Sequence, residues 1–510
     1  MTLLKYNKII FYIIPFFLGL ISSFSLPPYS FFFINFFTFP FLLFYLISNK
    51  HLGKLSSFNI GWMFGFGYFI SNLYWLTNSL TFEESFKPLI PFALILVPLF
   101  LGLFYGFAAL VSFFIGLKKN FSSIIIFSFI LSLFEYLRSF IFGGFPWNLI
   151  IFSLTDYLPL IQILSYIGTY SLNLIFITLC LIPTIIFFKY PNKIKIFYLS
   201  FIFLIMITNF IFGNLIIKNY EKLEETNIDT IIKIISPKIG INRFLLDVNP
   251  EKILVDLIKI SKPDKKKDTI FIFPEGVLSN IYLQDLKKFN HLFFENFSSK
   301  HKIILGINSY KDSKIFNSLV VIDNNTNVLS KYDKNKLVPF GEFLPFENFF
   351  EKLGSKKITQ GYLSFSSSDT RNLININNLN FLPLICYEII FSGNINQNNN
   401  LDYDFILNIS EDGWFGESVG PHQHFSHSIF RSIEEGKNVI RSANNGISAH
   451  INSKGQLIGK IITTKKGFIE FKSFKKVKKT HFSTYGNKIF FYFLIIYISL
   501  IAFLKLRENK

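Results

Sequence analysis

The stretch Asn380-Phe-Leu-Pro-Leu-Ile-Cys386-Tyr-Glu388 places a cysteine directly after an apolar run. The run 380–385 predicts a buried strand, so Cys386 would stand where that strand turns. A nucleophile at such a turn is exposed while the backbone N–H groups of its neighbours point at the same spot. Taken alone, the stretch fits a buried structural cysteine equally well.

Two further stretches end apolar strands with chemically useful groups. Glu275 ends the run Phe271-Ile-Phe-Pro-Glu275-Gly276, and a second stretch reads Tyr332-Asp-Lys334-Asn-Lys336-Leu-Val-Pro-Phe-Gly341-Glu342. Each alone is more typical of a solvated turn or an ordinary surface loop. Together with Cys386 they form a coherent set, because Glu275 can take the thiol proton while Lys334 stabilises an oxyanion and favours the thiolate.

The region around these stretches alternates between short apolar runs and helical patterns. This alternation predicts a layered sandwich of the α/β or α+β type. Segments 283–297 and 425–439 have helical spacing. The predicted strands are 230–235, 269–273, 303–307, 317–322, 380–385, 405–409 and 446–451.

The rest of the chain is so apolar that we expect it to lie in lipid and not in water. Of 510 residues, 50% are hydrophobic and only 16% are charged, and the runs 9–48, 89–117, 157–188 and 196–217 contain no Asp, Glu, Lys or Arg. We therefore expect a membrane part and a water-exposed part. The net charge of +18 does not indicate a nucleic-acid partner, because many lysines flank the hydrophobic segments and no basic stripe with interleaved aromatics is present.

The hydrophobic runs predict a polytopic α-helical membrane domain, since a helix crosses a bilayer with about 20 apolar residues. Eight helices are expected, at 9–26, 30–48, 57–80, 89–117, 121–142, 157–188, 196–217 and 486–504. The expected domains are a seven-helix membrane domain at 1–217, a catalytic domain at 218–480, and a last membrane helix with a short tail at 481–510.

Lysine and arginine are concentrated in alternate loops. The basic segments hold Lys5 and Lys8, Lys50 and Lys54, Lys118 and Lys119, Lys189, Lys193 and Lys195, and Lys505, Arg507 and Lys510. The intervening segments 25–29 and 81–88 contain a single lysine between them. The positive-inside rule then places both termini in the cytoplasm and the domain at 218–480 on the outer side of the membrane, which is the periplasm in a bacterium.

Three other features have more than one interpretation. Glu135 and Arg138 share a helix face in the membrane part, where they could form a packed polar site or pathway, or else a pair that snorkels to the interface. The second cysteine, Cys180, lies in a hydrophobic segment, so we expect no disulfide with Cys386. The motif His422-Gln-His424-Phe-Ser-His427 has the spacing of a metal site.

In combination, the motifs resemble the carbon–nitrogen hydrolase (nitrilase) superfamily, and the surrounding helices resemble its membrane branch, the apolipoprotein N-acyltransferase family. The matching patterns are Pro-Glu275, Lys334-x-x-Leu-Val-Pro-Phe-Gly-Glu342, Cys386-Tyr-Glu388, Glu135-Tyr-Leu-Arg138, Gly144-Phe-Pro-Trp147, Asp412-Gly-Trp414-Phe-Gly416, Gly420-Pro-His-Gln-His424 and Arg441-Ser-Ala-Asn444-Asn445-Gly446. This resemblance covers nearly the whole chain and implies an αββα sandwich for the catalytic domain. It also implies that the histidine motif at 422–427 is a structural loop and helix start and not a metal site.

The resemblance also implies roles for individual residues. Glu275 would be the general base, Lys334 the oxyanion lysine and Cys386 the nucleophile. The accessory active-site positions would be Glu342, which supports the triad, and Tyr387, Glu388 and Trp414. Two positions depart from the family pattern, Lys336 in place of His and Gly413 in place of Thr or Ser. The departures leave the triad intact and put only local substrate contacts in doubt.

The implied activity is a ping-pong acyl transfer that needs no cofactor and no metal. A phospholipid would donate an acyl chain to Cys386, and the amino terminus of a diacylglyceryl apolipoprotein would accept it. Both substrates would reach a monomeric enzyme from the membrane lipid. Segment 351–368 carries Gly354, Gly361 and Leu363 among polar residues and could serve as a lid. A membrane-tethered amidase and a degenerate, non-enzymatic scaffold are the alternatives.

Overall fold

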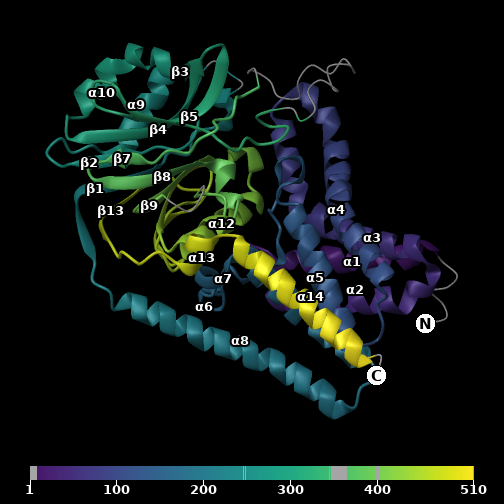
Figure 1. The fold of residues 1–510 in the computed structure, drawn as a ribbon. Helices are drawn as coiled ribbons and strands as arrows, with labels where there is room; N and C mark the ends of the chain where they lie inside the picture. Colours follow the sequence, from purple (N-terminus) through teal and green to yellow (C-terminus); the bar gives the residue numbers. More distant parts are fainter. Residues whose placement is uncertain are drawn as a thin grey trace. The chain divides into compact units, whose positions relative to one another are not determined.

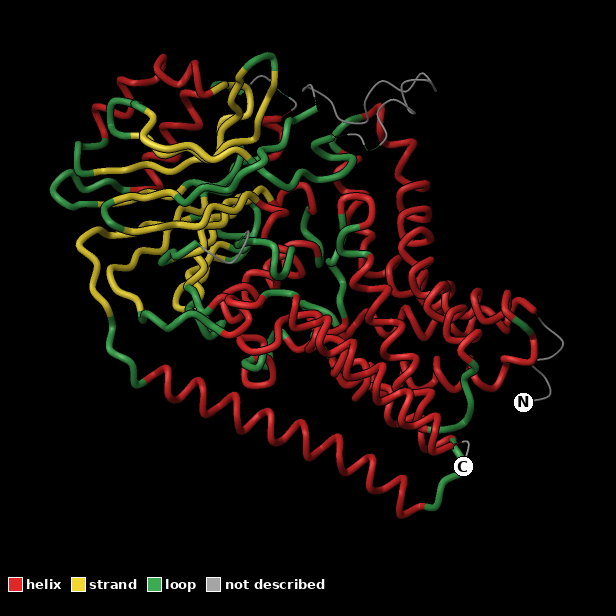
Figure 2. The backbone as a smooth tube through the Cα atoms, viewed as in Figure 1, coloured by secondary structure: helices red, strands yellow, loops and turns green. Residues whose placement is uncertain are grey.

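The computed structural model describes residues 8–244, 246, 248–343, 345, 364–396 and 401–508. The chain divides into two compact units (Figure 1). The membrane unit comprises Met1–Thr77, Pro88–Asn219 and Tyr485–Lys510, and the catalytic unit comprises Asn78–Lys87 and Tyr220–Thr484. Figure 2 shows that the strands belong to the second unit, whereas the first is built from helices.

The membrane unit contains a helix in each of the eight expected hydrophobic segments. They are α1 (Lys8–Ser22), α2 (Asn35–Asn49), α3 (Lys54–Leu73), α4 (Ile90–Ile115), α5 (Phe121–Leu137), α7 (Leu164–Leu181), α8 (Asn192–Glu221) and α14 (Lys488–Glu508), with the short α6 (Leu158–Ile161) before α7. Among the described residues, five stretches are long and apolar enough to cross a membrane: Phe32–Asn49, Glu84–Ile115, Leu164–Phe187, Asn192–Glu221 and Lys488–Glu508. The number of spans remains a prediction.

Glycines allow α3 to pack closely against α1 and α4. A Cβ atom on Gly67 would lie 2.0 Å from the backbone oxygen of Phe16 in α1, and one on Gly61 would lie 2.4 Å from that of Tyr105 in α4. No side chain fits in such gaps, so the backbones approach as small-residue interfaces permit in membranes. This close packing joins α3 to both of its neighbours, α1 and α4.

A buried polar cluster joins α4, α5 and α7. Glu135 accepts hydrogen bonds from Tyr105 Oη at 2.9 Å and from Asn173 Nδ2. Arg138 lies over the ring of Phe69, 5.1 Å from its centroid, and donates to the backbone oxygen of Phe145. Glu135 is 0% exposed and Arg138 is 1% exposed, so the pair forms a packed polar site and does not snorkel to the surface.

Two β-sheets form the centre of the catalytic unit. The seven-stranded sheet has the order β13-β1-β2-β4-β5-β6 with β3 beside β4, and the six-stranded sheet has the order β12-β11-β10-β9-β8-β7. Strands β1, β2 and β4 run parallel to one another, as do β8, β9 and β10, and β13, β5, β11 and β7 pair with them antiparallel. The strand bounds are β1 (Thr226–Ser236), β2 (Thr269–Ile272), β3 (Leu278–Tyr282), β4 (His301–Lys311), β5 (Lys314–Ile322), β6 (Val328–Asp333), β7 (Ile374–Ile376), β8 (Leu379–Ile385), β9 (Phe405–Glu411), β10 (Asn438–Asn444), β11 (Ser448–Ile451), β12 (Leu457–Ile461) and β13 (Gly467–Phe474).

The sheets stack face to face, with helices on their outer faces. One core cluster joins inward-facing residues of both sheets, such as Ile272 and Leu319 with Ile385 and Leu407. A second cluster packs α9 (Pro250–Ser261) and α10 (Asn290–Asn296) on the outer face of the first sheet (Figure 1). In the second sheet, α12 (Gly420–Glu435) packs on β10. The layers are those of the expected αββα sandwich.

All seven predicted strands are present, but both predicted helices need correction. The segment 425–439 is not one helix, because α12 ends at Gly436, which has φ +64° and accepts the left-handed cap conformation at little cost. Val439 already belongs to β10. The segment 283–297 begins as a 3-10 helix at Leu283–Phe289 and becomes α-helical only in α10.

Candidate active site

Two of the three expected triad residues form an ion pair. Lys334 follows β6 in sequence, and Glu275 follows β2. The Nζ atom of Lys334 lies 3.3 Å from Glu275 Oε1 and 2.8 Å from Glu342 Oε1. Cys386 follows β8, and the charges of both Glu275 and Lys334 act on its thiol. The three residues are buried, with Lys334 1%, Glu275 7% and Cys386 8% exposed. The structure therefore gathers the three predicted strand ends in one site.

Asn317, which the sequence patterns did not reveal, fixes the two glutamates. Its Nδ2 group donates to Glu275 Oε1 at 2.7 Å and to Glu342 Oε1 at 2.8 Å. The backbone N–H of Glu411 donates to Glu275 Oε2 at 2.9 Å, and that of Val338 donates to Glu342 Oε2 at 2.8 Å. Both carboxylates are thus held by hydrogen bonds on both oxygens, which orients them toward Lys334.

The backbone of Glu275 lies against Gly306 of β4. A Cβ atom on Gly306 would be 2.5 Å from Glu275 Cα and 2.8 Å from the nitrogen of Gly276. Only glycine lets β4 come this close, so the position of the carboxylate depends on a residue without a side chain.

Cys386 starts a tight turn with a left-handed backbone. Its φ is +73°, and the residues Cys386–Ile390 form a 3-10 helix directly after β8. A positive φ at a residue with a side chain is costly and persists only where surrounding contacts enforce it. Glu388 supplies one such contact, because its Oε2 atom accepts the backbone N–H of Ile385 at 2.7 Å.

Glu388 also ties the nucleophile turn to the loop that carries Lys334. Its Oε1 atom accepts hydrogen bonds from Arg371 Nη2 (2.7 Å), Tyr332 Oη (2.6 Å) and the backbone N–H groups of Asn335 (3.0 Å) and Lys336 (3.1 Å). Burial alone would raise the pKa of Glu388, but the Arg371 guanidinium and these hydrogen bonds hold it below its usual value. Arg371 was not among the predicted site residues, and its partners lie far from it in sequence.

The electrostatics of the site keep the sulfur protonated and the lysine charged. Burial raises the pKa of the Cys386 thiol well above its usual value, Glu275 raises it further, and Lys334 opposes both. Burial alone would lower the pKa of Lys334, but the carboxylates of Glu275 and Glu342 outweigh it and raise that pKa. The sulfur therefore needs a base to take its proton before it can attack a carbonyl.

Aromatic side chains accompany the predicted accessory residue Trp414. Its ring lies 5.1 Å from that of Phe244 and 5.8 Å from that of Phe82, between ring centroids. Phe82 belongs to the short segment Asn78–Lys87, which groups with the catalytic unit although it lies between two membrane segments in sequence. Another accessory residue, Tyr387, is buried and packs edge-on against Phe391 at 5.2 Å.

The two departures from the family pattern have different structural settings. The side chain of Lys336 is exposed, and its backbone N–H makes the contact with Glu388, so the residue type matters little to that contact. A Cβ atom on Gly413 would lie 2.6 Å from Glu411 Oε1 and 3.0 Å from Asn445 Nδ2. A Thr or Ser at position 413 would thus require Glu411 to shift.

The histidine motif and the second cysteine lie in different units. His424 and His427 are buried in α12, and no group of three or more His, Cys, Asp or Glu side chains suited to a metal occurs in the described part of the chain. Cys180 is fully buried in α7 of the membrane unit, and both cysteines are free thiols. Of the expected lid, residues 351–363 lie outside the described residues.

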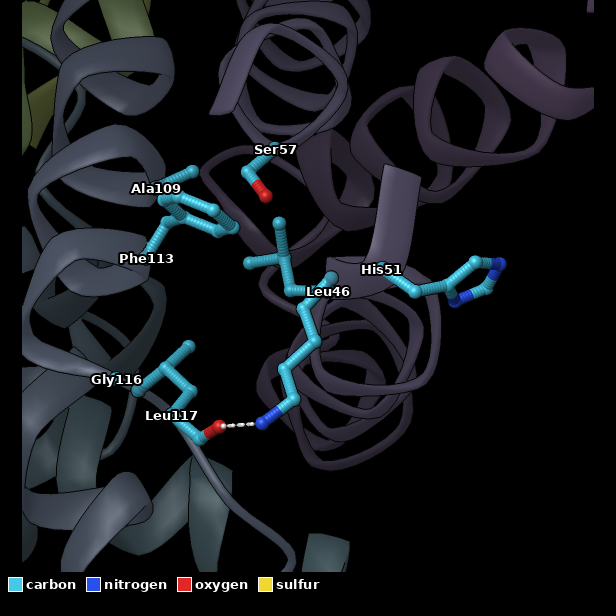
Figure 3. Close-up of a pocket in the computed structure, with 8 residues that line it drawn as sticks. Leu46, His51, Ser57, Ala109, Phe113, Gly116 and Leu117 are labelled. Atoms are coloured by element: carbon cyan, nitrogen blue, oxygen red, sulfur yellow. Dashed lines mark hydrogen bonds between the residues drawn. The ribbon is translucent and has the colours of Figure 1, made fainter. Parts of the chain in front are cut away.

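The membrane unit contains a cavity of about 340 Å³ between the ends of α2, α3 and α4 (Figure 3). Lys50 lies at its edge and donates from Nζ to the backbone oxygen of Leu117 at 3.1 Å. The cavity is lined by Leu46, Lys50, His51, Ser57, Ala109, Phe113, Gly116 and Leu117. None of these residues is a carboxylate or a thiol, so the cavity does not offer the chemistry of the buried site.

Two family models match the chain. One, described as the apolipoprotein N-acyltransferase N-terminal domain, matches residues 18–182. The other, described as carbon-nitrogen hydrolase, matches residues 292–471, a range that includes Lys334 and Cys386 and begins after Glu275.

Curated relatives match over most of their length. An apolipoprotein N-acyltransferase of Rickettsia prowazekii is 32% identical over 502 residues, which is 95% of this chain and 98% of the relative. Those of Agrobacterium fabrum (31% over 461 residues; 86% of this chain and 85% of the relative) and Brucella melitensis (28% over 470 residues; 89% and 87%) are similar in the same way. With a carbon–nitrogen hydrolase sandwich, a buried Glu–Lys–Cys site and apolar helices long enough to cross a membrane, this chain belongs to the apolipoprotein N-acyltransferase family and is an acyltransferase of lipoprotein maturation.

Proposed function

We propose that the enzyme moves an acyl chain from a phospholipid to the N-terminal amine of a diacylglyceryl-cysteine apolipoprotein through a thioester on Cys386. The proposal rests on the juxtaposition of a buried, protonated thiol with the Lys334–Glu275 ion pair. Glu275 takes the proton of the thiol, and the sulfur attacks the ester carbonyl carbon. The ammonium of Lys334 balances the negative charge that develops on the carbonyl oxygen.

The tetrahedral intermediate then collapses. The bond from carbon to the glycerol oxygen breaks, the leaving oxygen takes the proton from Glu275, and a lysophospholipid departs. In the second half, the α-amine of the acceptor attacks the thioester, gives its proton to Glu275, and the carbon–sulfur bond breaks. Cys386 recovers the proton, and the acceptor leaves with an amide bond.

The burial of the site supports transfer over hydrolysis. Lys334 and Glu388 are about 1% exposed, and Cys386 is 8% exposed, so little water reaches the sulfur. A water-excluded site strengthens the attraction between Lys334 and the oxyanion and protects a thioester that awaits an amine. Glu342, Tyr387, Glu388 and Trp414 complete the proposed site in supporting roles.

The proposed setting is a bacterial inner membrane with eight spans, both termini in the cytoplasm and the catalytic domain, 218–480, in the periplasm. The alternating basic loops support this orientation. We propose that the enzyme acts as a monomer and uses no cofactor. Reporter fusions after residues 53, 119 and 193 test the orientation, and periplasmic signals from these loops would contradict it.

The function is tested by replacing a resident acyltransferase with this chain in a depletion strain. Mass spectrometry of lipoprotein N-terminal peptides should show three acyl chains with the wild type and two with Cys386→Ser. A purified enzyme that releases free fatty acid from phospholipid and leaves the acceptor amine unmodified would instead indicate a hydrolase, and equal acylation by the two variants would exclude the thioester route.

A further inference from the structure

Asp412, His424 and Arg441 belong to three of the sequence motifs and have no role in the proposed acyl transfer. His424 lies in α12 and is fully buried, and its Nε2 atom is 3.2 Å from the backbone oxygen of Cys386. A carbonyl oxygen can only accept a hydrogen bond, so Nε2 must carry the hydrogen. The imidazole therefore donates to the backbone of the proposed nucleophile.

The opposite edge of the ring is fixed by charged groups. His424 Nδ1 lies 2.9 Å from Asp412 Oδ1 and 3.1 Å from Arg441 Nη2, and Arg441 Nη2 is 2.8 Å from Asp412 Oδ2. The Arg441 guanidinium and His424 hold the pKa of Asp412 well below its usual value, although burial alone would raise it. A carboxylate, a guanidinium and the imidazole thus contact one another, and all three side chains are fully buried.

Neighbouring residues pack against the His424 ring and against Asp412. The ring of Phe415 stands edge-on to His424 with centroids 5.6 Å apart, and Ser410 Oγ donates to Asp412 Oδ1 at 2.7 Å. Asp412 reaches its position because residue 446 is glycine, since a Cβ atom there would lie 2.1 Å from Asp412 Oδ2. Gly446 of the sequence motif therefore serves the same network.

The peptide plane between Cys386 and Tyr387 connects this network to the chemistry. A trans peptide is planar, and its C=O and N–H groups point in opposite directions. A hydrogen bond that fixes the carbonyl of Cys386 therefore also fixes the direction of the Tyr387 N–H. The left-handed φ of +73° at Cys386 makes this plane costly to hold without an external contact.

We propose that His424 is a positioning residue that aims the Tyr387 N–H at the oxyanion through the Cys386 carbonyl. This inference rests on the proposed thioester chemistry. Asp412 and Arg441 hold the imidazole, the imidazole holds the peptide, and the peptide N–H shares the oxyanion with Lys334. His424 itself does not touch the substrate.

The test compares His424→Phe and His424→Gln in the full-length enzyme in detergent micelles. Phe keeps a ring but has no donor, whereas the amide of Gln places an N–H near the position of Nε2. Single-turnover formation of the thioester from a fluorescently acylated phospholipid should fall about 10- to 100-fold in His424→Phe, since loss of one oxyanion donor costs about 10²–10³ and misalignment costs less. His424→Gln should recover most of this loss.

Alkylation of Cys386 by iodoacetamide separates positioning from simple damage. Alkylation displaces iodide at a saturated carbon and forms no oxyanion, so its rate in His424→Phe should stay within about threefold of the wild type. Equal thioester rates in His424→Phe and the wild type would overturn the proposal. A parallel loss of alkylation and thioester formation without rescue by Gln would also overturn it, because the histidine would then only support the fold.

A second pair of variants, His424→Asn and His424→Gln, tests the proposal if His424→Phe does not fold. The shorter amide of His424→Asn reaches the Nδ1 position and leaves the Cys386 carbonyl without its donor, so it should be slower than His424→Gln. Equal rates for Asn and Gln contradict the proposal. A wild-type enzyme that forms no thioester at all would refute the proposed function, and this outcome is distinct from a wild type and His424→Phe that react alike.

Discussion

The two units bury charged groups in opposite ways. In the catalytic unit, Lys334, Arg371 and Arg441 each lie within 3 Å of a carboxylate. In the membrane unit, Glu135 is held by the neutral donors of Tyr105 and Asn173, and among the described residues it forms no ion pair with Arg138.

This difference separates a charged group that we propose takes part in the reaction, Lys334, from a buried carboxylate that holds helices together, Glu135. Paired charges in a water-excluded site keep Lys334 cationic and strengthen its attraction for a developing oxyanion. A carboxylate satisfied by hydroxyl and amide groups presents no reactive partner, and it joins helices as polar side chains do in membranes. We therefore expect substitutions in the two units to differ both in size and in which measurement changes.

Removal of Arg371 should have the largest effect on stability. Arg371→Leu leaves the buried Glu388 carboxylate without its guanidinium, and breaking a buried pair costs about 3–5 kcal/mol. Unfolding in detergent, followed by tryptophan fluorescence, measures the loss. Arg371→Lys keeps the charge without the planar fork and should lie between Leu and the wild type. A stability change under 1 kcal/mol in Arg371→Leu would show that the catalytic unit does not depend on this pair.

Removal of Lys334 should affect the chemical step most. Lys334→Met should slow thioester formation about 10²–10³-fold, because an oxyanion donor is lost and the Glu275 and Glu342 carboxylates are left face to face. Lys331→Met is the matched control, since the ion pair of Lys331 with Asp333 lies nearer the surface. Comparable rates for the two variants would remove the distinction between acting and packing charges.

Acid should weaken the contribution of Glu388. Its pKa lies below the usual 4.5 in the folded state, so the carboxylate stabilises the fold above that pH and loses the effect as the pH falls through its folded pKa. The stability gap between the wild type and Glu388→Gln should be constant from pH 7 to about 5.5 and shrink below about 4.5. Thermal unfolding across this pH range measures the difference in stability. A difference that grows as the pH falls would contradict the prediction.

The smallest effect is expected in the membrane unit. Glu135→Gln keeps an acceptor for Tyr105 and turns the contact with Asn173 into an imperfect amide pair, which costs about 1 kcal/mol. Thioester formation should remain within about threefold of the wild type. A loss of rate comparable to that of Lys334→Met would show that Glu135 takes part in the reaction, and it would contradict the proposed difference between the two units.

Local sequence patterns predicted those strands of the catalytic unit that are apolar and buried along their whole length. Runs such as 269–273 and 405–409 were found because both faces of these strands are buried. Strand β6 was missed because most of its residues are exposed or half-buried, and β10 was missed because it starts two residues after the cap of α12.

Glu275 and Cys386 were predictable because each follows an apolar strand, and Lys334 was predictable from the motif that contains it. The residues that hold these three side chains in place were not predictable. Asn317 lies 42 residues from Glu275, and the N–H of Glu411 comes from a position 136 residues away. His424 was visible only as part of a histidine motif, and its contact with the Cys386 carbonyl arises from the packing of α12. Such contacts between distant segments require the fold.

The central claim is that Cys386 carries the acyl chain. Wild-type enzyme in detergent, given a phospholipid of defined acyl chains and no acceptor amine, should gain the mass of one acyl group on the peptide that contains Cys386. Hydroxylamine or an acceptor peptide should release it, and Cys386→Ala should neither gain mass nor turn over. N-acylation at the normal rate by Cys386→Ala, or a labile acyl group on another residue, would contradict the account.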